Sequence, residues 1–296
     1  MTTAKTDSGY FGPGSMMWYV LRNRLIGLAG SRALILQLCR PQVAQGVDDH
    51  SEFETAPLKR AINTLRALRT VVFSSKADAD RVLRNLGKKH GCVSGIIAAE
   101  TSMHHAGSHY SAAEQPSKLW VLASLADTVY YMHERLVGPL SPNHAVELWR
   151  DWQKFGALFH VDPDIMPASY RDFRRYMAGM LSGTGSNKHQ LVVDAGTVRR
   201  LSERLFSNVI AVLTASRSLT WGLLPPRMRP LAVQRWGGFI SIRHKFVFAI
   251  VRLLARFVPR QQRYDAGYLR MLALTDATAP GLDPWERAYS KRNATE

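Results

Sequence analysis

One histidine in this 296-residue chain, His90, stands on the apolar stripe of a predicted helix. His90 follows Leu86 by four residues and Leu83 by seven, so the three side chains share one face of a predicted helix. That face is apolar and is predicted to point inward. A neutral imidazole on an inward face is a common ligand for haem iron, although a lone inward histidine is more often a hydrogen-bonded core residue. The spacing makes His90 a candidate iron ligand.

Three polar residues form a second candidate group on another helix. Asn63 and Thr64 follow Arg60 by three and four residues, which places all three on one face of the helix predicted for residues 57–73. Their patch borders a strongly apolar stripe. For this helix alone, a solvent-facing edge is the simpler interpretation. A functional role requires a partner group, and His90 is the candidate for it.

Other kinds of active site find little support. His104, His105 and His109 cluster in a predicted loop and could bind zinc or copper, but the loop is not expected to provide an ordered scaffold with a carboxylate second shell. Cys39 and Cys92 form no CxxC pair, so neither a zinc site nor a disulfide framework is expected, and a cytoplasmic location is predicted. No GxSxG elbow and no phosphate-binding glycine fingerprint occurs, which disfavours acyl transfer and nucleotide-dependent chemistry.

The elements that must position these residues are helical nearly throughout. Apolar residues recur at helical spacing, and no alternation of strands with helices is evident. Pro57 suits a first helical turn, and Ser74 and Ser75 are candidate caps of the His90 helix, which is expected to reach about residue 97. Two short helices or one kinked helix are expected within residues 18–44, and further helices at 114–136, from 141, and at 169–181, 197–216 and 240–257. The predicted fold class is all-α.

One helical domain is predicted to occupy residues 16–260. Residues 1–15 are expected to be a flexible lead-in rich in Gly, Ser and Thr, and they lack the apolar stretch of a secretory signal. Residues 261–296 form a C-terminal extension rich in Arg, Asp and Pro, whose packing and role stay open.

The charge balance is unusual and bears on the choice of partners. Lys and Arg number 39 against 23 Asp and Glu, which gives a formal net charge of +16 that could attract nucleic acid, an anionic membrane or an acidic cofactor. The charges are spread over many helices without a basic arm or an aromatic–basic platform. Most of them are therefore predicted to be solvated surface, and no nucleic-acid partner is expected.

The late apolar stretch 246–258 raises the question of a membrane. Arg252 and Arg256 interrupt it, so it falls far short of the ~20 apolar residues that span a bilayer. Its helix also carries Arg243 and Lys245 and could lie on an anionic membrane surface. An apolar face buried in the core is the favoured interpretation, and at most peripheral membrane contact is expected.

Seven segments that occur in order make the chain resemble a known family. They are ALILQLCRPQVAQGVDDHSEF (33–53), PLKRAINT (57–64), KKHGCVSG (88–95), YSAAEQPSKLWV (110–121), YMHERLVGPLSP (131–142), VDPDIMPASYRDFRRYMAGML (161–181) and GLLPPRMR (222–229). The chain thereby resembles the bacterial and fungal oxygenases that include latex clearing protein, a haem-dependent rubber oxygenase, and the mycophenolic acid pathway oxygenase. The likeness covers about residues 12–260.

The resemblance implies a globin-like, all-helical core that holds haem b between the helices of Arg60 and His90. In the family the histidine of an HxxV motif is the proximal iron ligand, and the motif here is His90 with Val93. A family R-x-x-x-T pair on the distal side, near the iron and the propionates, matches Arg60 and Thr64. An arginine there can pair with a propionate or steady bound oxygen.

Two departures from the family's pattern bear on the reaction. Asn63 stands where the rubber oxygenases have a lysine able to cap the iron, and Arg40 precedes Pro41 where many members have a histidine. No clear counterpart of the rubber enzyme's catalytic glutamate is found near Ala44 and Gln45. Rubber cleavage itself is therefore not expected.

These observations together predict a haem-dependent oxidoreductase. His90 would ligate the iron, and O2 or peroxide would bind on the side of Arg60, Asn63 and Thr64. The substrate would be a small hydrophobic organic molecule that is oxygenated or dehydrogenated, with an electron donor as a further partner. Two alternatives stay open: a carrier or sensor that binds haem or lipid without turnover, and a basic helical protein associated with nucleic acid.

Overall fold

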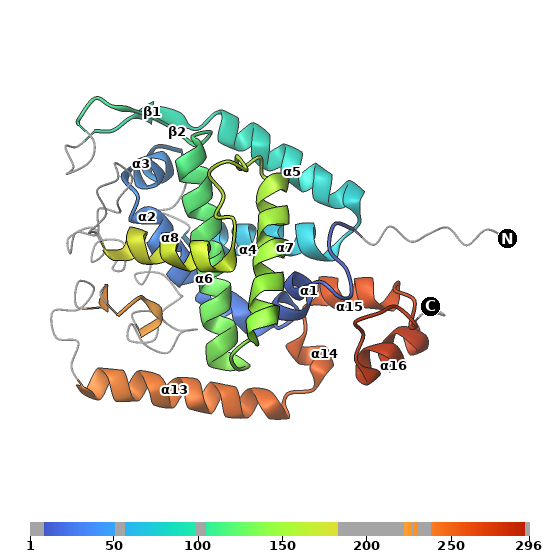
Figure 1. Cartoon of the computed structure of the whole chain (residues 1–296). Coiled ribbons are helices and arrows are strands. Elements are labelled where there is room, and N and C mark those ends of the chain that lie inside the picture. The colour runs from blue at the N-terminus through green and yellow to red at the C-terminus, as the bar shows by residue number, and fades with distance from the viewer. Residues whose placement is uncertain are drawn as a thin grey trace.

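Helices form nearly all the regular structure in this computed structural model, which describes residues 9–50, 57–98, 105–182, 222–226, 228–229 and 238–293. The sequence of elements is α1 (Met16–Leu21), the 3-10 helix η1 (Arg24–Ala29), α2 (Gly30–Leu38), α3 (Pro41–His50), α4 (Pro57–Phe73), α5 (Lys76–Gly91), β1 (Ser94–Ile96), β2 (His109–Ser111), α6 (Gln115–Leu136), α7 (Pro142–Leu158), α8 (Tyr170–Ser182), α13 (Gly238–Phe257), α14 (Arg260–Arg263), α15 (Ala266–Ala273) and α16 (Pro284–Asn293) (Figure 1). The all-α class is confirmed, with one antiparallel hairpin as a small addition.

Local sequence signals explain where several helices begin. Ser141 caps α7 by accepting a hydrogen bond from the His144 backbone N–H, and Pro142 occupies the first turn. Ser75 caps α5 in the same way through the Asp78 N–H. The prediction that the His90 helix reaches residue 97 is wrong: α5 ends at Gly91, and residues 94–96 instead pair with β2. The helix predicted for residues 197–216 lies outside the described residues.

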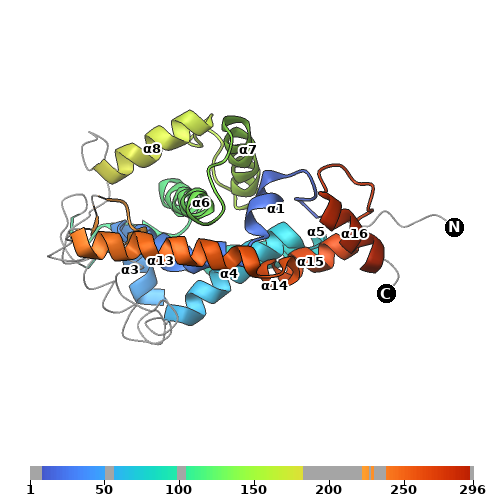
Figure 2. The ribbon, with the colours of Figure 1, turned by 90° about the horizontal axis from the view of Figure 1, so that it is seen from below.

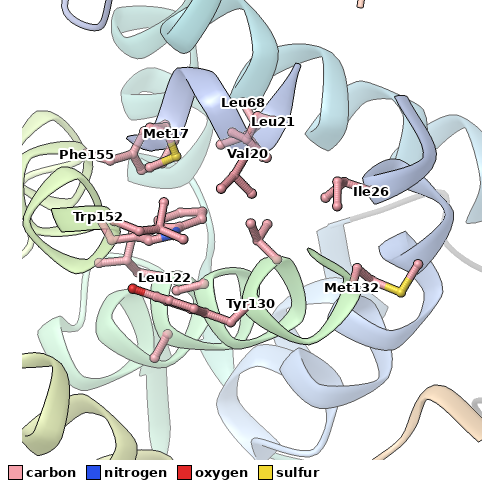
Figure 3. Packing of buried hydrophobic residues seen from close by; sticks show 14 of the residues in the cluster. Met17, Val20, Leu21, Ile26, Leu68, Leu122, Tyr130, Met132, Trp152 and Phe155 are labelled. Atoms are coloured by element: carbon pink, nitrogen blue, oxygen red, sulfur yellow. The ribbon is translucent and has the colours of Figure 1, made fainter. Parts of the chain in front are cut away.

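The longest described helix, α6, forms the centre of the hydrophobic core (Figures 1 and 3). Met17, Val20 and Leu21 of α1 pack on one side of it, and Trp152 and Phe155 of α7 lie nearby in the same cluster (Figure 3). Each large side chain buried in this way contributes ~1.5–3 kcal/mol through loss of apolar surface from water. The α6 helix is therefore a fixed support for the residues it carries.

A buried ion network joins α6 to its neighbours. Asp127 on α6 is only 6% exposed, and its two carboxylate oxygens accept hydrogen bonds from Arg32 of α2 and Arg174 of α8. Arg32 is 3% exposed and also donates to the Thr128 hydroxyl at 2.7 Å and to the Leu223 carbonyl at 2.8 Å. Because each of the three guanidinium nitrogens of Arg32 donates to a partner, the network fixes α2, α6 and residues 222–224 relative to one another.

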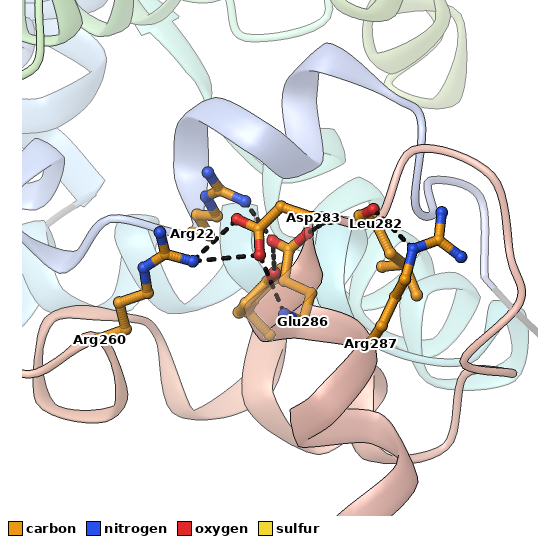
Figure 4. Close-up of polar contacts among 7 residues, drawn as sticks. Arg22, Arg260, Leu282, Asp283, Glu286 and Arg287 are labelled. Carbon is orange, nitrogen blue, oxygen red and sulfur yellow. Dashed lines mark hydrogen bonds and ion pairs between the residues drawn. The ribbon is translucent and has the colours of Figure 1, made fainter.

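The C-terminal extension, whose packing the sequence left open, joins the main core. Tyr264, Tyr268 and Leu272 are buried in the same hydrophobic cluster as α1 and α4. Glu286 of α16 is 2% exposed and accepts hydrogen bonds from Arg22 and from the Tyr268 hydroxyl (Figure 4). The burial of Glu286 and its ion pair with Arg22 hold α16 against the N-terminal part of the chain.

The α13 helix lies at the periphery of the molecule. It runs along the lower edge in Figure 1, and in the view from below in Figure 2 it lies in front of the other helices. Ala255 on its inner side is buried, but Phe246 and Phe257 are 64% and 77% exposed. The expectation that the apolar residues of this helix belong to the core is thus wrong for Phe246 and Phe257, which lie at the surface. None of the described helices is both long enough and apolar enough to cross a bilayer.

Candidate active-site cavity

A cavity of about 270 Å³ lies among α3, α4, α5 and α6, beside the hairpin and the end of α7. Its size is close to the lower limit of the ~300–1,000 Å³ typical of small-molecule sites. Its wall is mostly apolar and includes Val43, Val47, Leu68, Leu86, Val93, Val121, Leu122, Leu125, Phe155 and Phe159. Its polar members are Gln37, Gln42, His50, Thr64, His90, Ser111, Ser117 and Lys118.

His90 lines this cavity from the last turn of α5. The predicted apolar stripe does face the protein at Ala79, which is fully buried, and at Leu83 and Leu86, which are half-buried. The prediction that His90 is also inside is wrong, since its side chain is exposed, as are residues 87–92. The last turns of α5 extend past the packed core, so an open cavity and not a layer of side chains borders the imidazole.

The hairpin and α3 approach each other closely beside His90. A Cβ at Gly46 would lie 3.2 Å from Val93 Cγ1 and 3.1 Å from the Tyr110 ring, so glycine is what allows this contact. Tyr110 donates its hydroxyl proton to Asp49 at 2.5 Å. Burial together with this hydrogen bond raises the pKa of Tyr110 to about 12. These contacts place Val93 in the cavity wall, three residues after His90.

Of the three polar residues predicted on α4, the structure places only Thr64 at the cavity among those whose side chains it describes. Asn63 is exposed, is not part of the cavity wall, and accepts a hydrogen bond from Arg66 at 3.2 Å. Arg60 lies on α4, but its side chain is outside the described part of the structure. Thr64, His90 and Val93 are therefore brought together around one cavity by α4, α5 and the turn that follows α5.

Sequence reasoning missed most of the other polar groups in the wall. Gln37 and Gln42 are each 7% exposed and come from α2 and α3. In the sequence, these two residues are visible only as amides within the mainly apolar segment LILQLCRPQV. Helical spacing alone does not predict which site such amides would face. Lys118 of α6 also lines the cavity, and its Nζ donates to the His160 carbonyl at 3.4 Å.

Arg40 supports this wall from behind. It is 3% exposed, and its Nε donates to the hydroxyl of Ser117, a cavity residue, at 3.1 Å. Burial lowers the pKa of Arg40 below that of a free guanidinium, and burial also raises the pKa of nearby Tyr176 to about 12. Arg40 is thus a buried partner of α6.

The donor groups of the cavity suit haem better than a bare metal ion. The described residues contain no group of three or more His, Cys, Asp or Glu side chains that could hold a bare metal ion. Haem needs one axial ligand, apolar contacts for its ring and a few cations for its propionates. The cavity offers the His90 imidazole, a mainly apolar wall and Lys118, so its residues fit this group.

The loop histidines do not join the cavity. His109 lies on β2 opposite Ile96, His105 is exposed, and neither belongs to the wall. His104 is outside the described residues. The zinc or copper alternative therefore gains no cluster from the part of the loop that is described.

Comparison with known proteins places the chain in a family. The family model described as "ER-bound oxygenase mpaB/B'/Rubber oxygenase, catalytic domain" matches residues 17–260. No curated protein and no solved structure gives a significant match, so the globin-like core implied by the resemblance stays a prediction. The matched range includes all of the elements that line the cavity. The chain belongs to the mpaB and rubber oxygenase family of catalytic domains.

Proposed function

We propose that this protein is a haem b-dependent oxygenase or oxidase that acts on a small hydrophobic organic substrate, with His90 as the protein ligand of the iron. The observation that carries the proposal is the meeting of His90 and Thr64 at one mainly apolar cavity in a chain of an oxygenase family. When bound there, haem would supply the redox chemistry with O2 or peroxide.

The residues of the wall have distinct roles in this proposal. The apolar side chains contributed by α3, α6 and α7 exclude water and contact an apolar substrate. The Thr64 hydroxyl and the Gln42 side chain can hydrogen-bond to a polar oxygen in the cavity. The Lys118 ammonium group at the wall suits a carboxylate such as a propionate. Arg60, one helical turn before Thr64 on α4, would be a further partner for a propionate or for bound oxygen.

The test is the visible absorption spectrum of the protein purified from haem-supplemented cells, beside variants made identically. His90→Ala is expected to lose most of the Soret band. His50→Ala removes another imidazole from the same wall and should keep it, as should His144→Ala on the exposed side of α7. A Soret band that survives in His90→Ala and disappears in His50→Ala would assign the ligand to His50 and overturn our assignment.

Turnover is tested separately from haem binding. Wild-type holoprotein should consume O2 or peroxide when a suitable apolar substrate is present, and Thr64→Val should slow this reaction while its Soret band is retained. A holoprotein that shows no oxidation with any member of a broad panel of apolar substrates would favour the carrier or sensor function.

A further inference from the structure

We propose that the outer face of α13 docks on the surface of an anionic lipid bilayer. This role is separate from the cavity and does not depend on haem chemistry. Six apolar side chains lie along one side of α13, and each is at least 39% exposed. They are Ile242, Phe246, Ile250, Leu253, Leu254 and Phe257, and we call them the α13 outer face.

Packing within the described part of the chain does not explain the exposure of the α13 outer face. The inner side of the same helix already supplies the contacts that attach α13 to the protein: Ala255 is buried, and Phe248 and Val251 pack against the core. A helix that is apolar on two sides is normally buried on both of them. In Figure 1, α13 runs along the lower edge of the molecule, and the exposed fractions of its outer residues place the second apolar side at the surface.

The positive charge of α13 favours an anionic lipid surface as the partner of the α13 outer face. Residues 238–257 contain no Asp or Glu, and the helix carries Arg243, Lys245, Arg252 and Arg256. Lys245 and Arg256 are exposed beside the apolar residues. A long helix with basic side chains bordering large apolar ones binds in the plane of a membrane, where its apolar side enters the acyl boundary and its cations contact anionic headgroups.

A second copy of this chain fits the same face less well. Two copies would bring basic helix against basic helix, and each chain carries a formal net charge of +16, so their approach is opposed by like charge. An anionic bilayer neutralises the cations and covers the apolar side chains at the same time. No described helix can cross a bilayer, so α13 would lie along its surface.

The experiment is co-sedimentation of the full-length protein with vesicles of phosphatidylcholine, with and without phosphatidylglycerol. Wild type should bind the anionic vesicles and be released at high salt, which shortens the range of electrostatic attraction. The variant Phe246→Ser/Leu253→Ser/Phe257→Ser should bind about tenfold more weakly, because three large side chains no longer enter the acyl boundary. The matched control Ile165→Ser/Leu274→Ser, at sites 37% and 55% exposed outside α13, should bind as wild type does.

A second variant separates the contribution of the basic side chains to vesicle binding from that of the apolar ones. Lys245→Gln/Arg256→Gln keeps the apolar side chains and should lose the preference for anionic over neutral vesicles. Circular dichroism should be unchanged in all variants, since every substituted side chain is at least partly exposed. Failure of wild type to bind anionic vesicles, or equal binding by the triple-serine variant, would overturn the proposal. So would a wild-type dimer by light scattering that the triple-serine variant abolishes while no vesicle binding is seen.

Discussion

Replacing Asp127 by Ala should destabilise the protein strongly, because it removes the counter-charge of a buried guanidinium. Arg32 would keep its hydrogen bonds to Thr128 and to the Leu223 carbonyl, but its charge would stay 3% exposed without a carboxylate. Leaving one member of a buried ion pair unpaired costs about 3–5 kcal/mol of unfolding free energy. For a chain of this size, the expected fall in Tm is roughly 6–15 °C.

The assay is thermal unfolding followed by circular dichroism at neutral pH. The matched control is Asp172→Ala on α8, whose ion pair with Arg175 has side chains 37% and 73% exposed. Solvent screens that pair, so its loss should lower Tm much less. The double variant Arg32→Met/Asp127→Leu removes both buried charges and should recover a large part of the lost stability.

Two results would refute this reasoning. An Asp127→Ala protein that unfolds at the same temperature as Asp172→Ala would show that the charge on Arg32 is not buried in solution. A double variant that is less stable than Asp127→Ala alone would show that hydrogen bonds to Thr128 and Leu223 outweigh the cost of the unpaired charge.

Three further predictions concern the cavity, the pH dependence and the C-terminal helices. Gly46→Val should cost about 1–3 kcal/mol through overpacking against Tyr110, and haem titration should show weaker binding; unchanged affinity would contradict the placement of this wall. Burial lowers the pKa of His133, so the folded state favours the neutral imidazole and stability should fall as pH drops below about 6.5. Denaturant titrations of His133→Asn should show a smaller fall, and an identical one would assign it to other groups. Glu286→Ala should cost about 3 kcal/mol by leaving Arg22 without its buried partner, and limited proteolysis should then cleave near α16 faster than in wild type.

The helical class and several helix ends followed from the sequence because they depend on local interactions. The 57–73 helix is present as predicted, and Ser75 and Ser141 cap the helices that they precede. A cap is a contact between neighbours in the chain, so its signal is visible without the fold. The sequence also pointed to His90, through the spacing of one helix and through a resemblance whose family is now shown.

The sequence by itself determined which residues are chemically capable, and the tertiary structure decided which of them meet. Thr64 and His90 line one cavity while Asn63, on the same helix as Thr64, does not. Gln37, Gln42 and Lys118 enter the wall from three other helices, and periodicity within one helix cannot report which neighbour it faces. The same limit applies to α13, where the apolar pattern was correct but its outer side is exposed. Burial is decided by contacts between segments distant in the chain, and amphipathic spacing specifies only that a face is apolar, not what covers it.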